Sequence, residues 1–248
     1  MRTAMDTITR TDAAAGDAVS GGQALLRLMT WLSPSFPVGA FSYSHGIEYA
    51  VEAGLVRDAG TLADWVGAIV SRGAGRLDAA LFCRAWRAVV DDDRDELAET
   101  VVWADALRGT AETARESAAQ GDAFLLAART VWPAPQLDAL AHCAENDGRP
   151  VAYAVAVAAV AAAHRIALEP ALAAFVHAAA ANLVSAGVRL VPLGQTDGLH
   201  TLAALEPVIL ALVDDVPSRP FEEIGTAVPV VDWASMQHET QYTRLFRS

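Results

Sequence analysis

Ser42 and His45 are the residues best placed by type and spacing to act as a nucleophile and its base. They lie in the sequence FSYSHG at residues 41–46, and on a helix a spacing of three puts two side chains on one face. Such catalysis also needs an acid that orients the histidine, and neither that acid nor a GxSxG elbow can be assigned. The alternative is structural, with Ser42 or Ser44 capping a helix that holds Glu48 in its first turns. We therefore predict no catalytic residue and a protein that is not an enzyme.

The histidines do not have the spacing of a metal site. No HxxxH or HxH pattern occurs, and the adjacent His142 and Cys143 would point about 100° apart on a helix. We predict no metal ligand and no cofactor, while a site shared between two copies of the chain stays open. The six histidines are His45, His142, His164, His177, His200 and His238.

The charged residues exclude several classes of protein. The chain has 30 acidic and 18 basic residues, a net charge of −12, and no basic stripe, so nucleic acid is not an expected partner. Every basic residue is arginine. Without lysine there is no P-loop or kinase lysine and no Schiff-base nucleophile, which excludes P-loop nucleotide hydrolases, kinases and pyridoxal enzymes.

The sequence GQTDG at residues 194–198 resembles a phosphate-binding loop only superficially, because it lacks lysine and follows a predicted helix rather than a strand. We interpret it as a turn into a helix, with Thr196 or Asp197 as the N-cap. Gly194 and Gln195 then belong to a structural motif and not to a ligand site.

Aromatic residues gather in two places where a monomer gains little from them. Trp31, Phe36, Phe41 and Tyr43 surround the break at Pro34, Pro37 and Gly39, and the chain ends with Tyr242, Leu245 and Phe246 beside Arg244 and Arg247. Aromatic and arginine side chains dominate binding energy at protein interfaces. We predict that these residues bind a protein partner; the alternative is that the C-terminal residues pack on the chain's own helices.

Helical spacing of apolar residues dominates the chain, and no long alternating strand pattern occurs. We predict an all-α, single-domain bundle of about ten helices, with the alanine-rich segments 151–168 and 170–186 at its centre. The predicted domain covers residues 23–213, between a disordered tail at 1–22 and an extended, partner-binding tail at 214–248. Pro207 predicts a kink or break in the last helix.

Nothing in the sequence predicts export or membrane insertion. Residues 1–22 lack the apolar core of a secretory signal, and the longest apolar run, Val151–Ala163, has thirteen residues, against the roughly 20 that a bilayer needs. Cys83 and Cys143 form no disulfide framework. We expect two free thiols and a cytoplasmic protein.

Three segments resemble signatures of one family. WLSPSFPVGAFSYSHGIE at residues 31–48, VPLGQTDG at 191–198 and YTRLFRS at 242–248 are similar, in the right order, to those of UreF, the urease accessory proteins. The resemblance covers about residues 24–248. It implies an all-α, non-enzymatic homodimer that binds a UreD/UreH-type accessory protein and the UreG GTPase, and acts with them on the urease apoprotein to insert nickel.

The resemblance also implies roles for residues. The tail around Arg244 would become ordered on the UreD/UreH-type partner and help to present the UreG surface, while residues 36–48 would form interface or core. We predict partner binding by Phe36, Phe41, Tyr43, His45, Glu48, His238, Glu239, Tyr242, Arg244, Leu245 and Phe246. The structural motif positions are Pro34, Pro37, Gly39, Gly46, Gly194, Gln195, Thr196 and Asp197.

Two alternatives to a scaffold remain at this point. A nickel-binding metallochaperone is motivated weakly by His45, His142, His200 and His238, and a helical enzyme would need a pocket around Ser42 and His45. A trans-acting arginine that stimulates GTP hydrolysis is also conceivable, but the sequence favours none of the 18 arginines.

Overall fold

A computed structural model gives the fold of the chain, and it describes residues 19–248. Those residues form a single all-α domain without a β-strand, which confirms the predicted fold class. The α-helices are α1 (Gly21–Trp31), α2 (Ile47–Glu52), α3 (Ala59–Arg72), α4 (Ala74–Val90), α5 (Arg94–Ala106), α6 (Ala111–Val131), α7 (Pro135–Asp147), α8 (Tyr153–Ala163), α9 (Leu168–Leu190), α10 (Gln195–Asp215) and α11 (Pro229–His238). Three short 3₁₀ helices are η1 (Ala40–Ser42), η2 (Val216–Ser218) and η3 (Phe221–Glu223).

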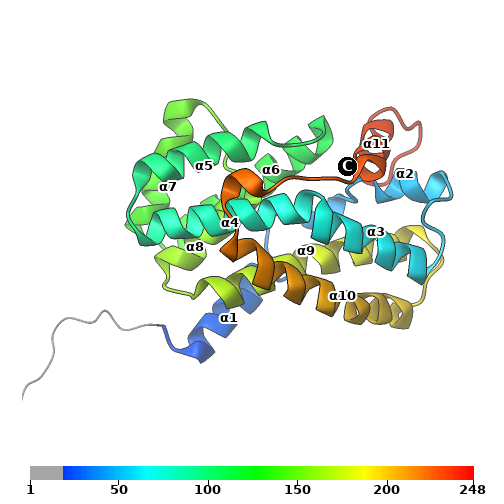
Figure 1. The fold of residues 1–248 in the computed structure, drawn as a ribbon, viewed down its shortest axis with the longest axis horizontal. Coiled ribbons are helices and arrows are strands. Elements are labelled where there is room, and N and C mark those ends of the chain that lie inside the picture. Colours follow the sequence, from blue (N-terminus) through cyan, green and yellow to red (C-terminus); the bar gives the residue numbers. More distant parts are fainter. Residues whose placement is uncertain (1–18) are drawn as a thin grey trace, which may run out of the picture.

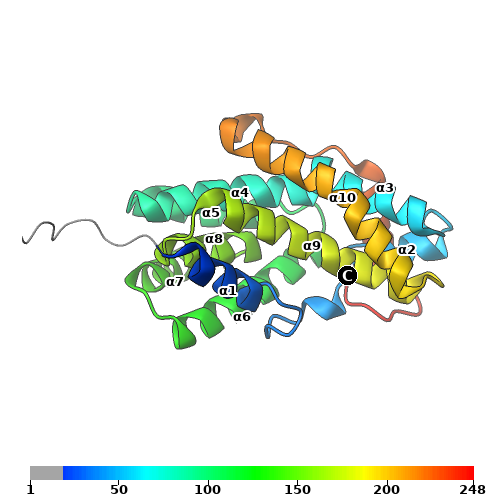
Figure 2. The same cartoon turned by 90° about the horizontal axis from the view of Figure 1, so that it is seen from below.

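Helix α8 forms the centre of the bundle. Its residues 154–162 are all buried alanine or valine, and it packs against α4, α6, α7 and α9. Figure 2 shows α8 between α4 and α6. Gly121 of α6 permits this packing, because a Cβ at that position would overlap the carbonyl oxygen of Val151. Small side chains let helix axes approach closely, as the alanine content of this segment predicts.

Helices α9 and α10 pack against each other and against α3 (Figure 1). Among the described residues, α9 is long and apolar enough to cross a membrane, but half of its most apolar window is buried inside the protein. Packing of a core helix therefore accounts for its composition. Helix α10 runs from Gln195 to Asp215 through Pro207, so of the predicted kink or break the break does not occur.

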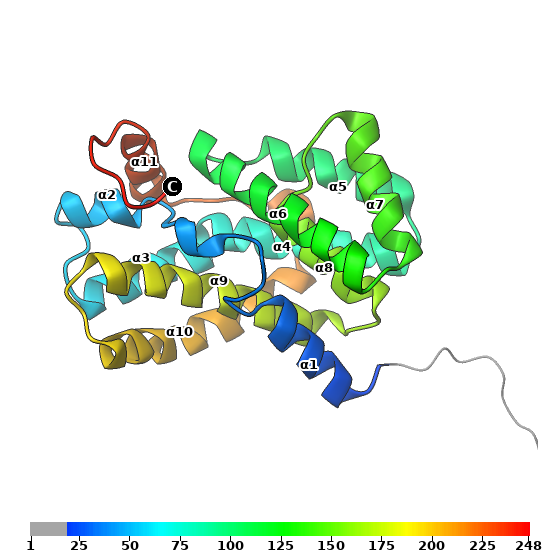
Figure 3. The same ribbon diagram turned by 180° about the vertical axis from the view of Figure 1, so that it is seen from behind.

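Residues 214–248 do not form the extended tail that the prolines of this region suggested. They contain η2, η3 and α11, and α11 packs against α2 and α6. Figure 3 shows the last residues passing beside α11 and α2. This region is therefore partly helical and not extended throughout, while its role as a partner-binding tail stays a prediction. Of the predicted N-terminal tail, residues 1–22, residues 1–18 lie outside the described part of the chain. Helix α1 begins at Gly21, within the remaining part of that range.

Candidate functional site

The anchor cluster, which we define as Glu48, Glu112, His238 and Arg244, joins α2, α6 and α11 to the C-terminal segment, residues 239–248. His238 is fully buried, with Nδ1 2.7 Å from Oε2 of Glu112 and Nε2 3.1 Å from Oε2 of Glu48. Arg244 donates from Nη1 to Oε1 of Glu112 at 3.0 Å. Buried charges are tolerated only when they are paired, and here two carboxylates face two basic side chains.

Glu48 also holds the main chain of the C-terminal segment. Its Oε1 accepts a hydrogen bond from the Leu245 amide at 2.7 Å, and its Oε2 accepts one from the Phe246 amide at 2.9 Å. Burial strengthens hydrogen bonds to an ionised group, so this carboxylate fixes the backbone of the segment.

Local sequence explains how Glu48 is positioned. Gly46, and not Ser42 or Ser44, is the N-cap of α2, although Oγ of Ser44 accepts a hydrogen bond from the Glu48 amide at 3.3 Å. His45 and Gly46 both have positive φ, 55° and 77°, and α2 begins immediately after them. The left-handed turn suits glycine and directs α2 against α11.

A second group of polar residues lies beside the anchor cluster. Oγ of Ser44 donates to the main-chain oxygen of Ser248, and Oγ of Ser248 donates to Oε2 of Glu116 at 2.9 Å. Burial raises the pKa of Glu116 to about 7, and burial lowers the pKa of His45, whose Nδ1 is 3.9 Å from Oε2 of Glu116, to about 4. Near pH 5.5 both side chains are therefore neutral, as suits a water-poor site.

The outer side of the C-terminal segment is exposed and apolar. Tyr242 is fully exposed and Leu245 is 78% exposed. Phe246 instead turns inward, where the guanidinium of Arg189 is 4.5 Å from its ring centroid and 3.7 Å from that of Phe41. The arginine thus links α9, η1 and the C-terminal segment by cation–π contacts.

The structure divides the predicted partner-binding residues between interior and surface. Five of them are exposed: Phe41, Glu239, Tyr242, Arg244 and Leu245. Phe36 and His45 are half-buried, and the ring centroid of Phe36 is 5.1 Å from that of Phe124. Four predicted residues are buried and do not belong to a contact surface in this conformation: Tyr43, Glu48, His238 and Phe246. These four side chains are buried because the C-terminal segment packs on helices of the same chain.

The predicted structural motifs form turns. Pro34, Pro37 and Gly39 lie between α1 and η1, with Gly39 at φ 72°, and Gly46 precedes α2. Gly194, and not Thr196 or Asp197, is the N-cap of α10, while Oδ2 of Asp197 accepts a hydrogen bond from the Gly194 amide at 2.9 Å. Gln195 and Thr196 occupy the exposed first turn.

Sequence analysis missed Glu112, Glu116 and Ser248. The two glutamates are four residues apart, which places them on one face of α6, and this spacing was the available signal. Their partners are 126 and 132 residues away in the chain, so local pattern gives no pairing.

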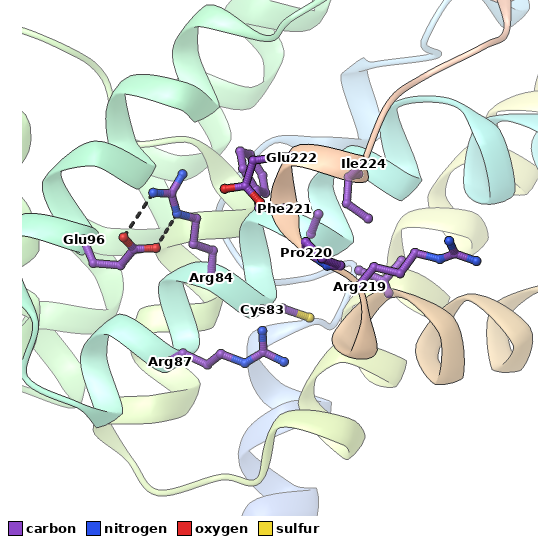
Figure 4. A pocket seen from close by; sticks show the side chains of 11 residues that line it. Cys83, Arg84, Arg87, Glu96, Arg219, Pro220, Phe221, Glu222 and Ile224 are labelled. Carbon is purple, nitrogen blue, oxygen red and sulfur yellow. Dashed lines mark hydrogen bonds and ion pairs between the residues drawn. The ribbon is translucent and has the colours of Figure 1, made fainter.

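Among residues 19–248, no group of three or more histidine, cysteine, aspartate or glutamate side chains is arranged to hold a metal ion. A cavity of about 260 Å³ lies between α4, α5 and residues 216–224 (Figure 4). Its arginines already have partners, Arg84 with Glu96 and Arg219 with Asp215, and burial raises the pKa of the Cys83 thiol to about 11, which makes it a poor nucleophile.

Comparisons with known proteins agree on one family. The family model for UreF matches residues 56–206. A protein of Rhodopseudomonas palustris (strain HaA2) is 49% identical over 227 residues, which cover 92% of this chain and 94% of the relative. Proteins of Bradyrhizobium sp. (strain ORS 278), 47% identical over 97% of this chain and 100% of the relative, and of Xanthobacter autotrophicus (strain ATCC BAA-1158 / Py2), 46% identical over 95% and 98%, are also similar. All three relatives carry the name urease accessory protein UreF.

Proposed function

The chain belongs to the UreF family of urease accessory proteins, and from this membership we propose that it is a non-catalytic scaffold for nickel insertion into urease. In this proposal it binds a UreD/UreH-type accessory protein and recruits or regulates the UreG GTPase. The resulting complex supports GTP-dependent loading of nickel into the urease apoprotein.

The observation that carries the proposal is the contrast between the two sides of the C-terminal segment. Its inner side is held by Glu48 and Glu112, whereas Tyr242 and Leu245 face outward. An exposed aromatic and an exposed leucine on an ordered backbone are typical of a binding surface, because little conformational entropy is lost on association. Helix α11 adds the exposed side chains of Trp233 and Met236.

A homodimer and a cytoplasmic location are part of the same proposal. Helix α1 exposes Leu25, Leu26 and Met29, and an isologous contact between two copies would bury them. Cys83 and Cys143 are both free, as suits a reducing compartment. Light scattering of the Leu26→Glu variant tests the dimer: a monomer supports this surface, and an unchanged dimer contradicts it.

Co-purification with the two accessory partners tests the scaffold function. The Tyr242→Ala/Leu245→Ala double variant should fold normally but capture the UreD/UreH-type partner at least tenfold more weakly, since two such contacts contribute about 2–4 kcal/mol. Leu126→Ala, which removes an exposed leucine of α6, is the matched control. Equal capture by the double variant and the control would contradict the proposed surface.

A further inference from the structure

Both ring nitrogens of His238 face carboxylate oxygens, so the protonation state of the ring decides which of these contacts can be hydrogen bonds. The distances are 2.7 Å to Glu112 and 3.1 Å to Glu48, and the ring is fully buried. A neutral imidazole carries one N–H and one lone pair, so it satisfies only one of these contacts. The other contact needs a second proton, on the ring or on a carboxyl group.

The contacts and the basicity of these groups place the second proton on the ring. Glu48 accepts from the amides of Leu245 and Phe246, and Glu112 accepts from Arg244. A proton on Glu48 would thus meet hydrogen-bond donors instead of an acceptor. A proton on Oε2 of Glu112 could donate to Nδ1 of the ring, but imidazole is the stronger base of the two groups, so the ring holds the shared proton. The imidazolium form satisfies every contact, and the four side chains of the anchor cluster then sum to zero charge.

We propose that His238, as an imidazolium, is the positioning residue that fixes the C-terminal segment for partner binding, so that the segment is released when the ring loses its second proton. This inference rests on the proposed function. The charged groups facing the ring are Glu48 from α2 and Glu112 from α6, and Arg244 of the C-terminal segment faces Glu112. Glu116 of α6 and His45 lie beside this cluster and contact Ser248 and each other.

The direction of the pH effect follows from the contacts. When the ring becomes neutral at higher pH, one nitrogen lone pair faces a carboxylate oxygen and the buried cluster has a net charge of −1. The shorter contact, from Nδ1 to Glu112 at 2.7 Å, keeps the remaining proton, so the lone pair of Nε2 faces Glu48. Because Glu48 is then repelled from the ring, the amides of Leu245 and Phe246 lose a well-placed acceptor. Ordering of the segment, and with it partner affinity, should therefore fall as the pH rises.

Hydrogen exchange of the full chain, followed by NMR between pH 6 and 9, measures this ordering without any partner. Protection factors of the Leu245 and Phe246 amides, corrected for intrinsic exchange, should fall about ten- to a hundredfold in His238→Gln, since hydrogen bonds to charged groups contribute ~1.5–3 kcal/mol. Nitrogen-15 spectra should identify His238 as an imidazolium at pH 6. His177→Gln, which changes an exposed histidine of α9, should leave both amides protected.

Glu112→Gln separates the charge of His238 from its shape. The side-chain nitrogen of the introduced glutamine can donate to Nδ1 of a neutral ring, its oxygen can accept from Arg244, and Nε2–H of the ring still serves Glu48. In this variant the loss of protection at high pH should disappear. A neutral His238 in the wild-type protein at pH 6, protection that is independent of pH, or a Glu112→Gln variant with the wild-type pH profile would each overturn the inference.

Partner capture at pH 6.5 and 8.5 separates this inference from the proposed function. Weaker capture at pH 8.5 by the wild-type chain, but not by Glu112→Gln, supports the positioning role. Capture that depends on Tyr242 and Leu245 but not on pH overturns the positioning role alone. If capture depends neither on Tyr242 and Leu245 nor on pH, while amide exchange changes with pH as expected, the proposed binding surface is wrong. The assignment of His238 as an imidazolium then still holds.

Discussion

Gly46 approaches Ser235 so closely that a Cβ at position 46 would lie 2.9 Å from the Ser235 backbone nitrogen. This contact holds the start of α2 against α11, next to the anchor cluster. Oγ of the same serine is 2.8 Å from Oγ1 of Thr110, the N-cap of α6. One contact region thus aligns the three helices that supply Glu48, Glu112 and His238.

Gly46→Ala should therefore destabilise the protein by about 3 kcal/mol, because it adds a steric overlap to a strained positive φ. Gly39→Ala is the matched control: it has a similar φ of 72° but no atom within 4 Å, so only the backbone strain of about 1 kcal/mol is expected. Urea denaturation measures both. Equal losses for the two variants would show that the contact with Ser235 is unimportant.

Glu116 makes stability depend on pH near neutrality. Its pKa is raised from 4.5 to about 7, so the folded protein keeps a proton there that the unfolded chain releases, and its contribution to stability falls as the pH rises from 4.5 through 7. Glu116→Gln removes this loss. The free energy of unfolding of the variant, relative to that of the wild type, should be about 2 kcal/mol higher at pH 8 than at pH 5.

Thermal and urea unfolding at the two pH values test this expectation, with Glu239→Gln, an exposed glutamate, as the control. A gain at pH 5 that equals the gain at pH 8 would mean that Glu116 does not titrate between them in the folded protein.

Arg189 should be sensitive to replacement by another cation. Lysine keeps the charge but loses the flat guanidinium that lies against Phe41 and Phe246, so Arg189→Lys should cost about 1 kcal/mol and loosen the C-terminal segment. Arg115→Lys changes an exposed arginine of α6 and should be neutral within about 0.5 kcal/mol. Hydrogen exchange of the Phe246 amide shows whether the loss is local; unchanged exchange would argue against the stacking role.

The two thiols should react at different rates. Burial raises the pKa of Cys83 to about 11 and also raises the pKa of Cys143, which is the more accessible of the two. Alkylation of the native protein at pH 7.5 should therefore be slow and should modify Cys143 first, with both residues reacting rapidly after unfolding. Mass spectrometry identifies the order, and prior labelling of Cys83 would contradict its burial.

Local chemistry predicted most helices of the bundle. The alanine and valine run of α8 lies at the centre, as predicted for segment 151–168, and Asp93, a residue type that favours helix starts, caps α5. Asp58 is the N-cap of α3, and Thr61 is its capping-box partner three residues later. Both residue types favour helix starts, so the sequence narrowed the choice without deciding it.

The C-terminal region was predicted poorly for a related reason. Prolines 217 and 229 suggested extended chain, yet each lies in the first turn of a helix, η2 and α11, where proline needs no amide hydrogen. What stabilises the segment is contact with Glu48, about 190 residues earlier in the chain. Such pairing depends on tertiary structure and leaves no local pattern in the sequence.

The anchor cluster joins residues 48 and 112 to residues 238 and 244, and this has a consequence during synthesis. The helices that carry Glu48 and Glu112 emerge from the ribosome well before residues 238–246 do, so the cluster cannot form until that later segment has been made. A chain that stops before residue 238 would leave both carboxylates without their basic partners.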